Sequence, residues 1–252
     1  MVRWRRRRYD MKKSHTIIAV AAMLFLITAI LITSFQLAAY GDPEYKFYEK
    51  EYAKYNVTED LGMEMPEVMD VTEHMMAYLI GEEEELSVIT DVEGKNQDFF
   101  NEQDRAHMAD VKNLFLGGLD VRTACLVIFL ILMALLAFRK ADLKRLIPKA
   151  YSAGLGLFLV IVVLLGLLFA SDFTKYFTIF HEIFFTNDLW LFDPATDYMI
   201  RMLPEGFFYD MTMRIGAVFI GSLAVIWIVL RVWRTVTAKR DGKKDKDDKR
   251  HL

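Results

Sequence analysis

Long apolar segments alternate with polar ones along the chain, and the apolar segments have the length of membrane spans. A bilayer core about 30 Å thick is crossed by roughly 20 apolar helical residues. The sequence predicts four transmembrane helices, at about residues 16–39, 119–138, 150–170 and 215–233. The first span is longer than the roughly 7–15 apolar residues of a secretory signal, so we expect an uncleaved anchor. The expected fold is an all-α integral membrane protein.

Charge predicts which side of the membrane each connection occupies. Lysine and arginine gather in 1–15, 139–149 and 234–252, and such residues are retained on the cytoplasmic side. The connection 40–118 instead holds 20 acidic residues against six lysines and arginines. We therefore place 40–118 and 171–214 outside and both termini in the cytoplasm. Anionic inner-leaflet lipid accounts for the basic termini, so no nucleic-acid partner is expected.

The pattern predicts a single membrane domain at 16–233. It lies between a basic cytoplasmic tail, 1–15, and a basic, disordered cytoplasmic tail, 234–252. Mean hydropathy is +0.21 although 26% of the residues are charged, because apolar and charged residues are segregated along the chain. Cys125 is the only cysteine, which excludes an intramolecular disulfide and a multi-cysteine zinc site.

The two outer loops are predicted to form an extracellular cap of short amphipathic or interfacial helices. Apolar residues of 66–79 recur at spacings of three and four, which is the helical period. Asn101, followed by Asp104, predicts the start of another helix. The second loop is rich in aromatic residues, which suits the bilayer interface or a roof over the helices. The acidic run 82–85 is expected to be a solvated loop.

Two histidines of the outer loops are candidates for chemistry. His107 precedes Asp110 by three residues, so a helix places both on one face. A carboxylate there would orient the imidazole, as an aspartate does in a hydrolase triad. His181 lies in the aromatic loop. Taken singly, each histidine is better explained as an interfacial or structural residue, and spacing does not show that the two meet.

On these residues the sequence resembles the lipoprotein intramolecular transacylase family, integral membrane proteins of Gram-positive bacteria. The resemblance covers the four-span layout and three patches of the outer loops. The patches are 77–79, 107–112 and, in the second loop, 180–181, 184–185, 190–194, 197, 200–201 and 204–208. The acidic run and the basic tails carry no part of it.

The resemblance implies an acyltransferase that moves one acyl chain within a bacterial lipoprotein. The chain would pass from the sn-2 ester of the diacylglyceryl group to the α-amine of the N-terminal cysteine, leaving the lyso form. The implied partners are the diacylglyceryl-modified lipoprotein and membrane lipid. We expect no cofactor and no metal, a monomer, and a multi-pass protein of the plasma membrane of a Gram-positive bacterium with its active site on the extracellular side.

The resemblance assigns the chemistry to His107 and His181. We expect general acid/base catalysis, in which one imidazole takes the proton of the amine and the other stabilises the oxyanion or protonates the leaving group. Asp110 favours His107 as the base, and the reverse assignment stays open. Asp110, Asp193 and Arg201 are expected to orient a histidine or to hold the roof loop, and Tyr78 and Trp190 are further supporting residues. Arg201 also suits a lipid-headgroup anchor or an anion-binding group.

Other functions remain open at this point. His107, Asp110 and His181 would suffice as ligands of a catalytic zinc ion in a metal-dependent membrane hydrolase. A non-enzymatic scaffold or sensor subunit would instead use its acidic outer loop to bind a partner. A channel or transporter is disfavoured, because the charges within the predicted spans, Asp120, Arg122 and Arg231, all lie near span ends.

Overall fold

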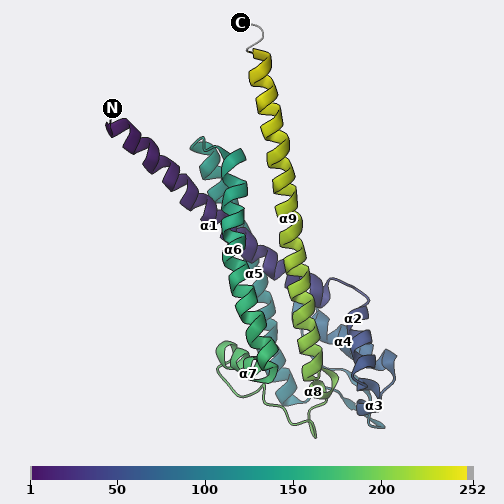
Figure 1. Ribbon diagram of the computed structural model, residues 1–252. Helices are drawn as coiled ribbons and strands as arrows, with labels where there is room; N and C mark the ends of the chain where they lie inside the picture. The colour runs from purple at the N-terminus through teal and green to yellow at the C-terminus, as the bar shows by residue number, and fades with distance from the viewer. Residues whose placement is uncertain (1, 249–252) are drawn as a thin grey trace. The chain divides into compact units, whose positions relative to one another are not determined.

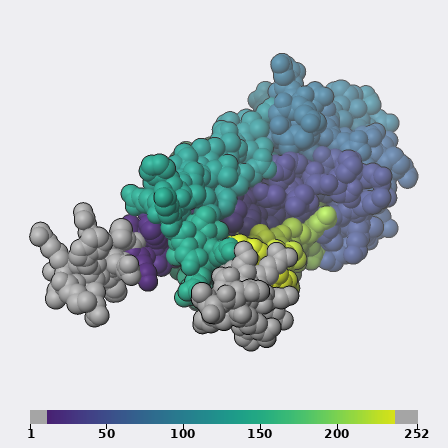
Figure 2. Space-filling model, turned by 90° about the horizontal axis from the view of Figure 1, so that it is seen from above, coloured from purple at the N-terminus to yellow at the C-terminus, as the bar shows by residue number. Residues whose placement is uncertain are grey.

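The structure is a computed structural model that describes the backbone of residues 2–248 and the side chains of residues 12–237, the coloured part of Figure 2. Helices dominate it (Figure 1). In chain order the elements are α1 (Val2–Tyr40), α2 (Lys46–Lys54), α3 (Val57–Leu61), α4 (Met65–Ile80), β1 (Ile89–Val92), β2 (Lys95–Asp98), α5 (Glu102–Phe138), α6 (Leu143–Ser171), α7 (Phe173–Phe184), α8 (Tyr198–Met202) and α9 (Glu205–Asp248).

Four of these helices are long and apolar enough to cross a membrane. Within the described side chains they run over Lys12–Tyr40, Glu102–Phe138, Leu143–Ser171 and Glu205–Thr237. Each contains one predicted span, so the prediction of an all-α membrane protein with four spans is confirmed. Large apolar side chains stay exposed on them, such as Leu130 at 63% and Val225 at 61%. Apolar surface of this extent suits lipid rather than water.

The last helix continues beyond the predicted end of the fourth span at residue 233. α9 continues through Asp248, so residues 234–248, for which the sequence predicts disorder, are helical. Lysine and arginine are good helix formers, and extending an existing helix avoids the cost of nucleating a new one. Residues 249–252 of the predicted tail lie outside the described residues.

The chain forms two compact units, and residues 16–233, predicted as one domain, contribute to both. The first unit consists of the described residues of Met1–Ser34, Val121–Leu164 and Val218–Leu252. Its core combines Ala19, Ala22, Met23 and Ile27 of α1 with Leu136, Ala150, Tyr151, Phe219 and Leu223. Figure 2 shows α6, in teal, against α1, in purple. Small residues allow this approach, since a Cβ at Gly154 of α6 would lie 3.1 Å from the Ile27 side chain.

The second unit consists of Phe35–Asp120 and Leu165–Ala217 and contains α2, α3, α4, α7 and α8. The helix predicted at 66–79 is confirmed as α4. The Glu64 and Glu67 side chains close a capping box at its start, and Gly81 ends it with a φ of 85°. Its apolar face is buried, and Thr72 lies 2.7 Å from the Tyr52 hydroxyl of α2.

A β-hairpin in the second unit is absent from the prediction. β1 and β2 are antiparallel, with Val92 opposite Lys95. Glu93 and Gly94 connect them with φ values of 52° and 73°, as a two-residue type I′ turn requires. The strands have four residues each, and only Val92 is buried. Too little alternation of apolar and polar residues remains to reveal them in the sequence.

We predict that Gly206→Ala destabilises the second unit. A Cβ at this position of α9 would lie 2.4 Å from the Tyr55 ring, and such overpacking costs about 1–3 kcal/mol. Thermal unfolding of the purified protein in detergent should show a lower Tm. Gly117→Ala is the control, because nothing lies within 4 Å of its new Cβ. Equal Tm values for the two variants would contradict the prediction.

Candidate active site

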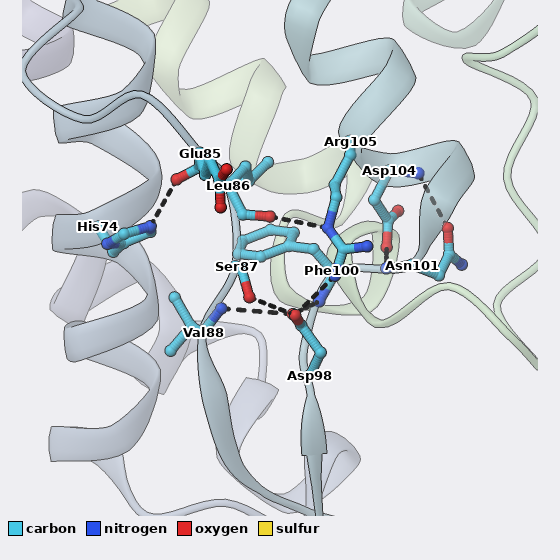
Figure 3. A network of polar contacts seen from close by, with 10 residues as sticks. All are labelled: His74, Glu85, Leu86, Ser87, Val88, Asp98, Phe100, Asn101, Asp104 and Arg105. Carbon is cyan, nitrogen blue, oxygen red and sulfur yellow. Dashed lines mark hydrogen bonds and ion pairs between the residues drawn. The ribbon is translucent and has the colours of Figure 1, made fainter.

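A polar network in the second unit fixes the first turn of α5 (Figure 3). Asn101 and Asp104 form the predicted cap: the Asp104 amide donates to Asn101 Oδ1 at 2.9 Å, and the Asn101 amide donates to Asp104 Oδ2 at 3.0 Å. Arg105 donates to the Leu86 carbonyl at 2.9 Å and pairs with Asp98 at 2.6 Å. Capping of this kind stabilises a helix start by about 1 kcal/mol, so the turn that precedes His107 is held on both sides.

Capping also defines the position of α7. Its N-cap residue Asp172 accepts a hydrogen bond from the Lys175 amide at 3.1 Å. At the other end, the Phe185 amide donates to the His181 carbonyl at 2.8 Å. This last bond holds Phe185 against the histidine one turn before it.

His107 of α5 and His181 of α7 lie together, although their helices are far apart in sequence. The ring centroids are 6.2 Å apart, and the ring planes are inclined by 29°. Both side chains are buried, with 6% of His107 and 9% of His181 exposed. The second unit therefore contains two shielded imidazoles side by side.

One hydrogen bond assigns the protonation of His181. Its Nδ1 lies 2.8 Å from the carbonyl oxygen of Phe177, one turn earlier in α7. Because a carbonyl oxygen only accepts, Nδ1 carries the hydrogen in the neutral ring. The lone pair is then on Nε2, which is the basic nitrogen of His181.

His107 has hydrogen-bonding capacity left over. Its Nδ1 is buried and has no hydrogen-bond partner among the described residues. Most buried polar atoms in native proteins are paired, so an unpaired ring nitrogen next to a second histidine is a place where a bound molecule would donate or accept.

Aromatic rings enclose the two histidines. Phe185 contacts both, at centroid distances of 5.0 Å from His107 and 5.6 Å from His181. Phe192 lies 5.3 Å from His107, and Trp190 lies 5.0 Å from His181. The enclosure supplies apolar surface and removes water from the imidazoles.

Burial lowers the pKa of both histidines. Loss of solvation lowers the pKa of His107, and the neighbouring His181 adds to the effect while the Asp110 charge opposes it. For His181, desolvation outweighs the bond to the Phe177 carbonyl, which acts upwards on its pKa. Both residues lie outside the predicted spans, His107 in the part of α5 before residue 119. Both rings are therefore neutral at pH 7 and able to accept a proton.

The sequence model of the lipoprotein intramolecular transacylase family, Lit, matches residues 20–208. The chain belongs to this family. It is accordingly an acyltransferase of the lipoprotein transacylase class and a multi-pass membrane protein.

Solved structures of one relative support the assignment. The membrane-integral lipoprotein intramolecular transacylase Lit of Bacillus cereus is 26% identical, with a TM-score of 0.73 over 92% of this chain and 98% of that chain. Two structures of the same protein have one histidine replaced, by arginine or by alanine. Each is 25% identical with a TM-score of 0.70, over 93% and 92% of this chain and 96% and 97% of those chains. No protein with a curated description matches the chain.

Asp110 of this transacylase holds the aromatic loop. Its Oδ2 accepts a hydrogen bond from Asn187 Nδ2 at 2.9 Å. No hydrogen bond joins Asp110 to His107 within the described part of the chain, and Asp110 acts on His107 through its charge. The sequence favoured His107 as the base because Asp110 would orient its ring by a hydrogen bond. The described part of the structure contains no such bond, so this reason does not hold.

The other expected supporting residues lie in different surroundings. Arg201 pairs with Asp60 at 2.9 Å and with Glu93 at 2.6 Å. It thereby joins α8 to α3 and to the hairpin turn. Its charge is used in these two ion pairs, and not for a lipid headgroup or a bound anion as expected. The Asp193 amide donates to Asp197 at 2.6 Å within the turn before α8.

Tyr78 and Trp190 differ from each other in whether they contact a histidine. Tyr78 is buried beneath the Lys112 ammonium, 4.0 Å from its ring centroid, and no contact with either histidine is found among the described residues. Trp190 alone of the five supporting candidates packs its ring on a histidine. Asn187 and Gln103 tie the aromatic loop to α5, and neither is among the residues that the sequence pattern indicated. Gln103 is one turn before His107, a spacing that would have suggested it.

The zinc alternative lacks a ligand set. Among the side chains that the structure describes, no group of three or more His, Cys, Asp or Glu residues is arranged to hold a metal ion. His107 and His181 are brought together, but Asp110 is engaged with Asn187.

We predict that Phe185→Ala raises the pKa of both histidines towards the ordinary value of about 6.5. The substitution lets water reach the two rings that Phe185 covers, and water stabilises the imidazolium form. NMR titration of the histidine ring signals in detergent measures the shift. Phe180→Ala is the control: Phe180 contacts His181 at 5.5 Å, so His107 should titrate as in the wild type. An unchanged titration of both rings in Phe185→Ala would contradict the prediction.

Proposed function

We propose that this transacylase transfers the sn-2 acyl chain of a diacylglyceryl-modified lipoprotein to the α-amine of its N-terminal cysteine, at His107 and His181. One observation carries the proposal: two buried, neutral imidazoles lie side by side, and each has a nitrogen available to a substrate. The reaction needs proton transfer and stabilisation of an oxyanion, which this pair supplies without a cofactor.

The substrate supplies its own nucleophile. The α-amine and the ester belong to one molecule, and correct orientation of such groups lowers the barrier by roughly 7–11 kcal/mol. An α-amine has a pKa of about 7.7–8.0, so it must lose a proton before or during attack. An imidazole is well matched to accept that proton near neutral pH.

His181 is the base in this mechanism. Its Nδ1–H is held by the Phe177 carbonyl, so the lone pair of Nε2 takes the proton as the amine nitrogen attacks the ester carbonyl. The new C–N bond gives a tetrahedral oxyanion, and the C–O bond to the glyceryl oxygen then breaks. The proton passes from His181 to that oxygen, which leaves an amide and a free sn-2 hydroxyl.

His107 stabilises the oxyanion. A neutral imidazole has one N–H to donate, and Nδ1 of His107 has no competing partner among the described residues. In the water-poor aromatic enclosure such a donor contributes more than it would in water, because charges interact more strongly at low dielectric constant. The two histidines thus have separate tasks.

The site is proposed to face the extracellular side of the plasma membrane of a Gram-positive bacterium, with both termini in the cytoplasm and the enzyme acting as a monomer. The acidic 40–118 segment and the basic 139–149 segment support this orientation by the positive-inside rule. Exposed apolar residues of α7, Ile183 at 71% and Phe184 at 50%, support a position at the lipid surface, where the acyl chains of the substrate reach the site.

We predict that His107→Ala and His181→Ala each lower acyl transfer by about 10²-fold or more, the usual contribution of acid/base or oxyanion groups. Mass spectrometry of lipoprotein N-terminal peptides from expressing cells distinguishes the N-acylated, mono-acylglyceryl form from the free-amine diacylglyceryl form by its fragments. His74→Ala is the control, because this half-buried histidine of α4 in the same unit bonds the Glu85 carbonyl (Figure 3). Full transfer in either catalytic variant would refute the mechanism.

A second pair of variants separates the two roles. Glutamine keeps an N–H donor but is not a base, so His107→Gln should retain more transfer than His181→Gln. Initial rates of transfer in membranes, with equal amounts of each variant, measure the difference. Greater activity of His181→Gln would reverse the assignment and make His107 the base.

A further inference from the structure

The loop between α7 and α8 carries Trp190 and is tied to α5 at two places. Asn187 donates to Asp110 at 2.9 Å. Gln103 Nε2 lies 3.1 Å from the Leu189 carbonyl oxygen and 2.9 Å from the Leu191 carbonyl oxygen. Residues 185–192 contain no helix or strand, so these side-chain bonds add to the backbone bond from the Leu191 amide to the Asp188 carbonyl in fixing the loop.

The two bonds of Gln103 have a specific geometry. A carboxamide nitrogen carries two hydrogens, and here each is directed at a carbonyl that neighbours Trp190, one before it and one after it. The carbonyl groups of Leu189 and Leu191, the residues on either side of the tryptophan, are therefore held by one nitrogen atom. No other natural side chain of this size offers two coplanar hydrogens and no charge.

Trp190 is the residue that this arrangement positions. Its ring centroid lies 5.0 Å from that of His181, with the planes inclined by 32°. The indole covers a face of the imidazole and helps to keep water from it. A small displacement of the loop would uncover His181 and leave its ring free to change orientation.

We propose that Gln103 is a positioning residue for acyl transfer: its carboxamide holds the carbonyl groups of Leu189 and Leu191, on both sides of Trp190, and thereby keeps the indole ring against His181. The inference rests on the proposed function, in which His181 takes part in the reaction. The side-chain hydrogen bonds of Gln103 go to the loop and not to the histidines. It acts through Trp190, in the way that supporting residues fix the geometry of a site.

Substitutions of Gln103 that differ in hydrogen-bond donors, shape and charge should have different effects on the transfer rate. Gln103→Glu keeps the shape of the side chain, removes both hydrogens and places a negative charge against two carbonyl oxygens. Gln103→Met removes the hydrogen bonds without adding charge. Gln103→Lys restores donors to the two carbonyls, although with a different shape. The expected order of activity is Gln, Lys, Met, Glu.

The decisive experiment is a double-mutant cycle between Gln103→Glu and Trp190→Ala, with the transfer rate measured by mass spectrometry of the lipoprotein peptide. If Gln103 acts through Trp190, Gln103→Glu lowers the rate about 10-fold in the wild-type background and has little further effect once Trp190 is alanine. Multiplied losses in the double variant would overturn the inference. So would a wild-type rate in Gln103→Glu.

A second measurement reports the position of the indole without using activity. Trp4, Trp227 and Trp233 are replaced by phenylalanine, so that Trp190 is the only tryptophan, and quenching of its emission by acrylamide is measured under excitation selective for tryptophan. Gln103→Glu should increase the quenching constant several-fold, and unchanged quenching would count against the clamp. Gln97→Glu is the matched control, because Gln97 bonds the Tyr198 hydroxyl at 3.0 Å in the same unit, and it should change neither quenching nor rate.

The two proposals fail in different ways. If the wild-type enzyme does not transfer the chain, the proposed function falls, and the positioning role falls with it. If the wild-type enzyme transfers the chain and Gln103→Glu transfers it equally well, only the positioning role falls. Gln103→Met supplies the same comparison if the charged variant does not insert into the membrane.

Discussion

An imidazole that loses its water must stay neutral or find a counter-ion, because burial of an unpaired charge is costly. His107 and His181 are buried against each other, and neither accepts or donates a hydrogen bond to a carboxylate in the described structure. The site therefore depends on an enclosure that favours the neutral form. Phe185 and Trp190 supply this enclosure. The capped starts of α5 and α7 fix the two helices that carry the histidine rings.

Neutrality suits the proposed reaction, in which a histidine takes a proton from the amine of the substrate. A histidine that was already charged at neutral pH would have no lone pair for the amine proton. A lowered pKa keeps the base free, although it also reduces the affinity of that base for a proton. The substrate offsets this weakness, because its amine and ester are joined and the attack is intramolecular. A modest base is then sufficient, provided that its orientation is fixed, and the Phe177 carbonyl fixes it at His181.

The features that could be predicted from the sequence are those carried by short stretches of it. The four spans, the amphipathic helix α4 and the Asn101 cap follow from composition, from helical period and from residues three apart. The meeting of His107 and His181 follows from no such local signal, and only the family resemblance paired them. The hairpin at 89–98 is too short to show a period, and the helix beyond residue 233 extends from a span into residues whose polarity suggested disorder.

Polar side chains were the least predictable, since their partners are distant in sequence. Arg201 looked like a residue for lipid or anions, yet its charge is used by Asp60 and Glu93 to join α8 to α3 and the hairpin. Asp110 looked like the carboxylate that orients His107, yet its oxygen holds Asn187 of the aromatic loop. In both cases the sequence singled out a charged residue of the second unit, but it could not show which acceptors or donors would come within 3 Å of that residue.

The correction at Asp110 changes how the site is held together. Gln103, His107 and Asp110 are separated by four and three residues, so they project from one face of α5. The outer two bind the loop that carries Trp190, and the middle one faces His181. One rigid helix thus sets the position of an imidazole and of the loop that covers its neighbour. A helix holds such spacings more accurately than a loop does, and so the aromatic loop needs no secondary structure of its own to enclose the two rings.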